Sequence, residues 1–457
     1  MNQFDADSMH RLAKLALDGG EVATPEAALA LFQQYRVRIH LAPGWADTLA
    51  GQSCFLTALN TASRAFLGGV EVDGDLAPLL HVPLFAGQST AKVVRELGGA
   101  VVDTPSPHLP ALVIGNASTA INARFAIRPS WDGWCAQVAP HDTGLHLVAN
   151  DDNPLAGVCA AALAVSEAFS HIRGDSLEAG YRQIGLSLWD PLAVADWQSP
   201  ANRGPRLAYL PHDLWLIGLG HLGQAYAWVL GMLPYPQVRR PRLVLQDVDR
   251  ITASNLSTCL LVDADDVTRR KTRVVARRLE AIGFDIDLVE RRFGAQHKLQ
   301  PNEPTVALFG VDNVVARRDL DTSAFALIVE AGLGSGYRDF RSMRIHTLPG
   351  PHLASELWPA QMASQGATAL NAAYQQLAHA RGDLCGVTML AAKAVATPFV
   401  GAFAAGVVMA ELMRPLHGGG THASLDLQMQ TITHRLGAAM EPARTRCAFI
   451  ECEYTGP

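Results

Sequence analysis

The chain has 457 residues, of which 49% are hydrophobic and 18% are charged, and its formal net charge is -6. This length exceeds one ordinary core of about 100 to 200 residues, so we expect two or three packed domains. The small negative charge gives no reason to expect a nucleic-acid partner. The N-terminus lacks an apolar leader and the seven cysteines lack framework spacing, which favours a reducing cytoplasm without export.

The first half of the chain, taken as residues 1–178, predicts an α/β domain. Residues 35–43 predict a strand, residues 54–69 a helix that ends at glycine, and residues 110–118 a buried strand. The loop after the first strand, "APGWADTLAG", lacks three-glycine spacing and any acidic residue in the position that a ribose acid would take. We therefore expect this half to bind no nucleotide.

The clearest signal in residues 179–457 is "LWLIGLGHLGQAYAWVL", in which an apolar run ends at three glycines and a helical pattern follows. Gly218 and Gly220 allow a tight turn and a close approach to phosphate, and Gly223 allows the helix to pack on the strand. The next predicted strand, "RLVLQD", delivers Asp247 to a ribose hydroxyl. Many dehydrogenases and methyltransferases share these features, so an NAD(P)-dependent oxidoreductase remains an alternative.

Further elements follow in the same order as in a doubly wound sheet. A helix is predicted in 267–282, and the buried strand "TVALFGVDN" ends in Asp312 and Asn313, where open parallel sheets place ligands. Residues 394–410 carry no charge, but they are shorter than the roughly 20 residues of a spanning helix, so we expect a buried helix and no membrane partner. Residues 423–436 predict a strand that leads into a hairpin.

An internal repeat links the two halves. Residues 153–167 align without gaps on residues 397–411, with Pro, Gly, an Ala-Ala pair and Glu at the same offsets. The predicted fold is therefore two Rossmann-like doubly wound domains, a degenerate N-terminal copy and an active second copy. The second copy carries about 49 additional residues before its repeated helix, and Cys385 lies within them.

Together these residues resemble the ThiF/MoeB and ubiquitin-activating enzyme superfamily. The members share a glycine loop, Asp-x-Asp, a Ser-Asn-Leu segment, a lysine on the next helix and an Asp-Asn pair. Here the same series reads "GLGHLG" from Gly218, "DVD" from Asp247, "SNLST" from Ser254, Lys271 and "DN" from Asp312. In its size, its unusual "NLST" segment and its lack of zinc-binding Cys pairs, the chain resembles the bacterial ubiquitin-activating-like enzymes of antiphage operons, such as BilD.

The resemblance implies ATP and magnesium as cofactors. It assigns Asp247 to the ribose, Asn255 and Lys271 to the phosphates, and Asp312 to magnesium. The three glycines and Asp249 complete the expected nucleotide site. Thr258 stands where the family has an arginine. Arg182, in a segment similar to the family's Arg-Gln-Ile, is a candidate replacement that would reach the site of a partner subunit.

The resemblance also implies adenylation of the C-terminal glycine of a ubiquitin-like protein, thioester transfer to Cys385 in a crossover segment at about 340–390, and hand-over to a ubiquitin-conjugating-like enzyme. An adenylating enzyme without a thioester step and a non-catalytic scaffold remain alternatives. The other internal cysteines, Cys54, Cys135 and Cys159, are expected to be structural. Cys447 and Cys452 lack a second Cys pair for zinc. The arrangement predicts a homodimer or an internal pseudo-dimer.

Overall fold

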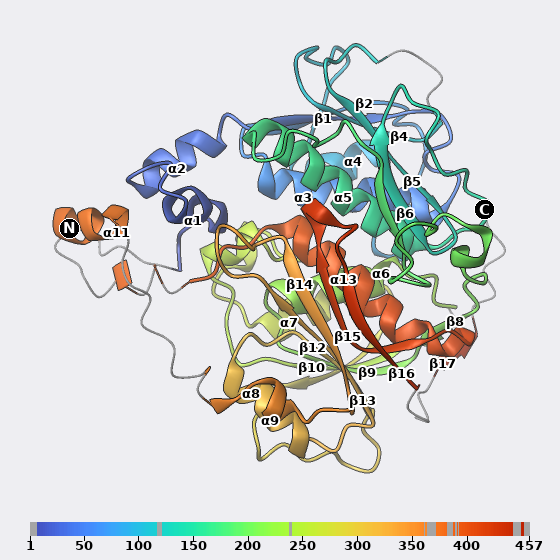
Figure 1. The fold of residues 1–457 in the computed structure, drawn as a ribbon, viewed down its shortest axis with the longest axis vertical. Helices are drawn as coiled ribbons and strands as arrows, with labels where there is room; N and C mark the ends of the chain where they lie inside the picture. Colours follow the sequence, from blue (N-terminus) through green and yellow to red (C-terminus); the bar gives the residue numbers. More distant parts are fainter. Residues whose placement is uncertain are drawn as a thin grey trace.

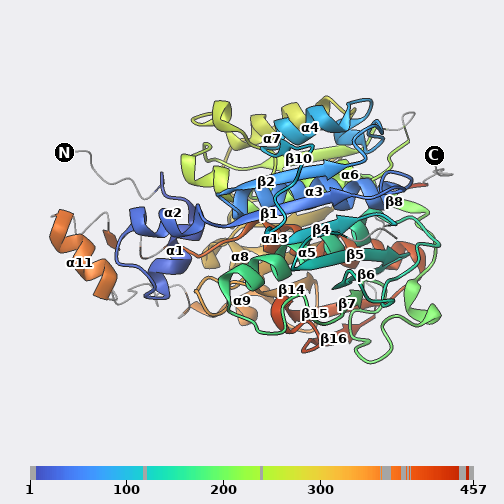
Figure 2. The same cartoon turned by 90° about the horizontal axis from the view of Figure 1, so that it is seen from above.

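The fold was obtained as a computed structural model of the whole chain. The structure describes residues 7–116, 121–236, 240–360, 362, 372–381, 387–388, 391, 393–441 and 449–451. Two sheets face each other across a layer of helices, with the first half of the chain on one side and the second half on the other (Figures 1 and 2). The predicted fold class, two doubly wound α/β halves, is confirmed.

The first half forms a seven-stranded sheet of order β3-β2-β1-β4-β5-β6-β7. Its inner strands are parallel, and β6 and β7 extend it in the antiparallel sense. The strands are β1 (Arg36–Leu41), β2 (Gly69–Gly74), β3 (Ala100–Val101), β4 (Ala111–Ile114), β5 (Ala126–Asp132), β6 (Cys135–Pro140) and β7 (Ile184–Ser187). The helices are α1 (Arg11–Asp18), α2 (Pro25–Phe32), α3 (Leu49–Ala65), α4 (Thr90–Glu96) and α5 (Pro154–Arg173).

The second half repeats this plan in an eight-stranded sheet of order β11-β10-β9-β12-β13-β14-β15-β16. The strands are β9 (Asp213–Ile217), β10 (Arg242–Gln246), β11 (Asp285–Val289), β12 (Val306–Phe309), β13 (Leu327–Leu333), β14 (Ser342–Leu348), β15 (Thr421–Gln428) and β16 (Leu436–Met440), and β8 (Tyr209–Pro211) pairs with β17 (Phe449–Glu451). The helices are α6 (His221–Met232), α7 (Lys271–Glu280), α8 (Val314–Arg318), α9 (Ala354–Leu357), α11 (Ala372–Arg381) and α13 (Pro398–Met413). Because β9, β10 and β12 are parallel, their carboxyl ends lie at the same edge of this sheet, where open α/β sheets bind ligands.

The repeated sequences form α5 and α13, which pack on each other between the sheets. A Cβ at Gly406 of α13 would lie only 2.4 Å from Cys159 Sγ of α5, so small residues allow the helices to approach closely. One core cluster includes residues of both halves, so the halves share a continuous hydrophobic core. α5 is long and apolar enough to cross a membrane by length and composition, but 89% of that stretch is buried inside the protein.

Two expected boundaries differ from the structure. β7 follows the boundary expected at residue 178, yet it pairs with β6, so the first half as defined by its sheet extends to Ser187. The crossover segment expected from residue 340 begins with β14, which pairs with β13 and β15 inside the second sheet. Sequence pattern could not show these pairings because a short strand acquires its partner only in the folded sheet.

Candidate functional site

The glycine loop confirms the predicted strand, turn and helix. Gly218 follows β9 with a φ of 82°, a backbone conformation that glycine adopts without strain. A Cβ at Gly223 would lie 1.8 Å from the carbonyl oxygen of Gly218, so only glycine allows the helix to pack this closely on the strand end. Gly220 caps α6 and lines a cavity of about 1000 Å³. The N-terminus of α6 is therefore directed at this cavity, as an anion site requires.

The two acids behind β10 hold the loops that surround the cavity. Asp247 Oδ2 accepts a hydrogen bond from the Leu219 amide at 2.6 Å, and Asp247 Oδ1 accepts one from the Asp249 amide at 2.7 Å. Both acids line the cavity. The Asp247 carboxylate thus ties the glycine loop to the end of the neighbouring strand.

Lys271 is the first residue of α7 and places its ammonium group beside these acids. Its Nζ lies 3.1 Å from Asp249 Oδ2, and the side chain is buried. Burial by itself would lower the pKa of Lys271, but the carboxylates of Asp247 and Asp249 outweigh it and the net pKa is raised. The lysine therefore remains a cation at neutral pH.

The Ser-Asn-Leu segment forms a short 3-10 helix at the cavity wall. Asn255 Oδ1 accepts a hydrogen bond from the Thr252 backbone amide at 2.9 Å. The side-chain nitrogen of Asn255, Nδ2, is then the atom that can donate to a ligand. Thr258 also lines the cavity, but it is buried and carries no charge.

Asp312 lies in the loop that follows β12. Its side chain is exposed and lines the cavity, and Asn313 caps α8 by accepting a hydrogen bond from the Val315 amide at 2.8 Å. This cap holds the residue next to Asp312 in place. The predicted residues that share the cavity are Gly220, Asp247, Asp249, Asn255, Lys271 and Asp312.

Arg11 lines the same cavity, although sequence reasoning did not find it. Its backbone amide donates to Ser257 Oγ at 3.3 Å, so α1 lies against the Ser-Asn-Leu segment. Burial lowers the pKa of Arg11, while nearby acids including Asp7 and Asp312 oppose that shift. No motif around Arg11 identifies it, because its role depends on the docking of the first half onto the second.

Four more cations that sequence reasoning missed line the cavity, namely Arg250, Arg270, Arg317 and Lys393. Arg317 Nε donates to the Val311 carbonyl at 3.1 Å, and its Nη2 lies 2.8 Å from the buried Glu330 carboxylate. Lys393 forms an ion pair of 2.8 Å with Asp7. Arg317 therefore braces the loop that carries Asp312, while Lys393 ties the N-terminal segment to the segment that leads into α13.

His221, directly after Gly220, is the neutral member of the site. Burial lowers its pKa to about 4, with a further decrease from Arg11. Its ring fits because position 401 in α13 is glycine, since a Cβ there would lie 2.2 Å from His221 Nε2. The start of α6 is thus locked against the first turn of α13.

Two predicted residues are not part of this cavity as described. Arg182 donates to the Gln430 carbonyl and lies 3.8 Å from Glu167 Oε1, and it does not line the cavity of its own chain. Its assignment to a partner's site stays a prediction.

The candidate cysteines Cys385, Cys447 and Cys452 lie outside the described residues. Cys54, Cys135 and Cys159 are buried and their thiol pKa values are raised by burial, as expected of structural cysteines.

The first half also has an acid directly after its second strand. Asp75 directly follows β2, as Asp247 directly follows β10. The two strand ends differ in their hydrogen bonds, because the Asp75 amide donates to the Leu41 carbonyl whereas the Gly218 amide donates to the Gln246 carbonyl. The expectation that the first half has no acid matched to Asp247 therefore stays a prediction. The indole of Trp45 is buried in this region and donates to the Asp75 carbonyl at 2.8 Å.

Two tandem halves of equal strand order, with a glycine loop, paired acids and a lysine in the second, define a ThiF-type protein similar to ubiquitin-activating enzymes, or E1 enzymes. Comparison with known proteins agrees with this class. The BilD N-terminal domain matches residues 36–188, and the BilD C-terminal domain matches residues 210–419. The chain therefore belongs to the BilD family.

A curated relative, the bacterial E1-like protein BilD of Collimonas sp. (strain OK412), is 44% identical over 91% of this chain and 90% of its own length. Among solved structures, E. coli MccB has a TM-score of 0.33 and 15% identity over 50% of this chain and 63% of its own, less than two thirds of MccB. PaaA has a TM-score of 0.31 and 14% identity over 50% of this chain and 64% of its own. TM-scores this low carry no argument, so the family assignment of this chain depends on the BilD domain matches and on the BilD relative.

Proposed function

We propose that the protein uses ATP to adenylate the C-terminal glycine of a ubiquitin-like protein. In this reaction a carboxylate oxygen attacks the α-phosphorus, and the bond to the leaving pyrophosphate breaks. The observation that supports it most directly is the cavity in which Asp247, Lys271 and Asp312 meet beside the N-terminus of α6. The approach of one anion to another requires fixed cations and amide dipoles, and this cavity supplies them.

Each part of the cavity has a proposed task. Asp247, held by two backbone amides, binds the ribose. The α6 N-terminus, Asn255 and Lys271 contact the phosphates. Arg11 supplies the phosphate cation that Thr258 lacks, because it enters beside the Ser-Asn-Leu segment.

Asp312 fits magnesium by the chemistry of its donor atoms. Mg²⁺ prefers one or two carboxylates together with substrate phosphates and water, and Asp312 presents an exposed carboxylate to the cavity. In the described part of the chain, no group of three His, Cys, Asp or Glu side chains could hold a metal. The ion would neutralise phosphate charge when bound, with most of its ligands supplied by ATP.

Exchange of labelled pyrophosphate into ATP tests the proposal. We expect exchange only when the ubiquitin-like substrate is present, since its carboxylate must bind before the α-phosphate is attacked. Asp312→Ala should reduce exchange at least about a hundredfold, the scale of losing one preorganised electrostatic group. Near-normal exchange by this variant contradicts the role of Asp312, and binding of NADH in place of ATP would favour an oxidoreductase.

We further propose that Cys385 receives the acyl group, which a conjugating enzyme then accepts. The thiolate attacks the acyl carbonyl, a thioester forms and AMP leaves. Wild-type protein with ATP, magnesium and substrate should form an adduct that survives denaturation but not a thiol reductant. Cys385→Ala should lose the adduct and retain pyrophosphate exchange. An adduct that persists in Cys385→Ala places the thioester on another cysteine, and the absence of any adduct in wild type means that the reaction stops at the adenylate.

A further inference from the structure

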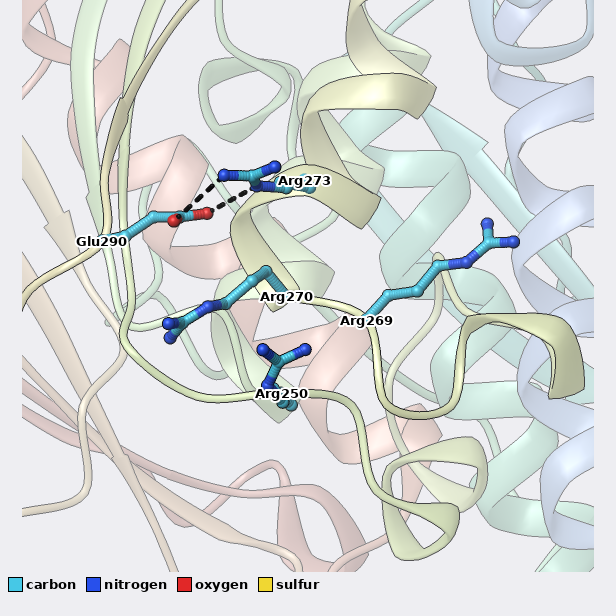
Figure 3. Close-up of a pocket in the computed structure, with 5 residues that line it drawn as sticks. All are labelled: Arg250, Arg269, Arg270, Arg273 and Glu290. Carbon is cyan, nitrogen blue, oxygen red and sulfur yellow. Dashed lines mark hydrogen bonds and ion pairs between the residues drawn. The ribbon is translucent and has the colours of Figure 1, made fainter.

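A second hollow, of about 410 Å³, adjoins the nucleotide cavity and is lined by charged side chains (Figure 3). The lining residues are Arg250, Arg269, Arg270, Arg273 and Glu290. Arg250 and Arg270 line both the hollow and the nucleotide cavity. The hollow is therefore an outward extension of the nucleotide cavity, beside the ends of β10 and β11.

Two of these arginines already form ion pairs, although the acid that pairs with Arg269 is shared with Arg277. Arg273 Nε lies 2.9 Å from Glu290 Oε1, and Figure 3 shows the two side chains facing each other. Arg269 pairs with the buried Asp266 at 3.3 Å and points away from the other side chains in Figure 3. Glu290 is the only acid among the described residues that line the hollow, and Arg273 engages both of its oxygens.

Arg250 and Arg270 differ from this pair because neither forms an ion pair within the described part of the chain. They lie opposite each other in an antiparallel bridge, where like charges destabilise the pairing. Arg250 donates to the Thr268 carbonyl at 2.7 Å, and Arg270 donates to the Val248 carbonyl. Each guanidinium carries five N–H donors, so most of them remain available to an anion.

We propose that Arg250 and Arg270 bind an acidic segment of the protein substrate as its C-terminal end enters the cavity. This rests on the proposed function, because an adenylated substrate must insert a chain end here. The guanidinium group matches a carboxylate in a bidentate geometry. The hollow has room for a few side chains but not for a folded domain.

Other anions fit this position less well. The triphosphate has its own partners in the amides at the α6 N-terminus, Lys271 and Arg11, whereas Arg250 and Arg270 also line the hollow beside Glu290. A nucleic acid would need many phosphate contacts, and the chain as a whole is negatively charged. Ion pairs between these solvent-accessible arginines and substrate carboxylates would be screened by salt and would contribute modestly to affinity. The site should therefore mainly guide and select the substrate.

A labelled oligoglutamate peptide with a blocked C-terminus tests the site in the full-length protein by fluorescence anisotropy. Wild type should bind the peptide at low salt and release it at high salt. The double variant Arg250→Gln, Arg270→Gln should bind about five- to tenfold more weakly. Arg269→Gln is the matched control, because the Arg269 side chain points away from the other arginines (Figure 3). This variant should bind the peptide as tightly as wild type does.

Competition separates this site from the nucleotide site. Saturating ATP or pyrophosphate should leave the peptide bound, and displacement by pyrophosphate would assign the arginines to phosphate and overturn the proposal. Equal peptide binding by wild type and the double variant would also overturn it. If the double variant fails to fold, Arg250→Gln alone, at an exposed position, should still weaken binding about threefold. Failure of ATP to bind contradicts the proposed function without affecting this measurement.

Discussion

Arg11 enters the nucleotide cavity from the first half of the chain, while the acids and the lysine there belong to the second. The arginine begins α1, and its amide contact to Ser257 sets it beside the Ser-Asn-Leu segment. Burial lowers the pKa of Arg11, and the nearby acids Asp7 and Asp312 oppose that shift. A desolvated cation of this kind interacts more strongly with phosphate than an exposed one does.

We therefore predict that Arg11→Ala raises the KM for ATP in pyrophosphate exchange at least about tenfold, the scale of one charge-assisted contact. Arg11→Lys should recover part of the loss. Arg182→Ala is the matched control, and in a monomeric chain it should change the KM little, since Arg182 lies outside the cavity. If Arg11→Ala binds ATP normally in calorimetry, α1 has only a structural role.

The helices α5 and α13 have a repeated sequence, but the repeated glycine contacts different groups in the two helices. Gly157 and Gly401 occupy the same position of the repeat. A Cβ at Gly157 would lie 2.0 Å from the Ala50 carbonyl oxygen, which belongs to the backbone of α3. A Cβ at Gly401 would instead meet the His221 ring, which is a side chain and can rotate.

This difference predicts unequal costs of the same substitution. Gly157→Ala should lower the free energy of unfolding by more than about 3 kcal/mol, because α3 and α5 must move apart, and Gly401→Ala by about 1–3 kcal/mol. Denaturant unfolding measures both values. The pair Gly401→Ala with His221→Ala should cost less than the sum of the single changes. Additive costs would mean that the ring is not the obstacle.

At the scale of the whole molecule, two sheets of the same order produce one nucleotide cavity among the described residues. The strand register gives both halves an acid after the second strand, Asp75 and Asp247. Only the second half has a glycine loop beside its acid, and the first half has the buried Trp45 there. The first half thus serves as the docked partner that contributes Arg11.

Calorimetry should accordingly find one ATP per chain. Asp247→Ala should abolish binding, because the carboxylate both contacts the ribose and holds the Leu219 amide. Asp75→Ala, the equivalent change in the first half, should leave the stoichiometry at one. A stoichiometry of two, or loss of binding through Asp75→Ala, would show that the first half binds nucleotide as well.

The glycine loop, the acids behind β10, Lys271 and the Asp-Asn pair were all predictable from the sequence, because each depends on local turn chemistry and on the ends of neighbouring strands. The repeat that forms α5 and α13 was also predictable, since an apolar helix shows its regular pattern of residues directly in the sequence. The sequence pattern set the first half's boundary too early, because β7 is recognised only by its pairing with β6.

The set of cations that line the cavity could not be predicted from the sequence. Arg11 and Lys393 come from segments more than 380 residues apart, and they reach the site through contacts between the halves that no local pattern encodes. The position of Asp75 directly after the pair of Leu41 and Gly74 likewise depended on strand register, which is fixed by packing of the whole sheet. The absence of an ion pair at Arg250 and Arg270, within the part of the chain that the structure describes, likewise depends on distances in the folded chain.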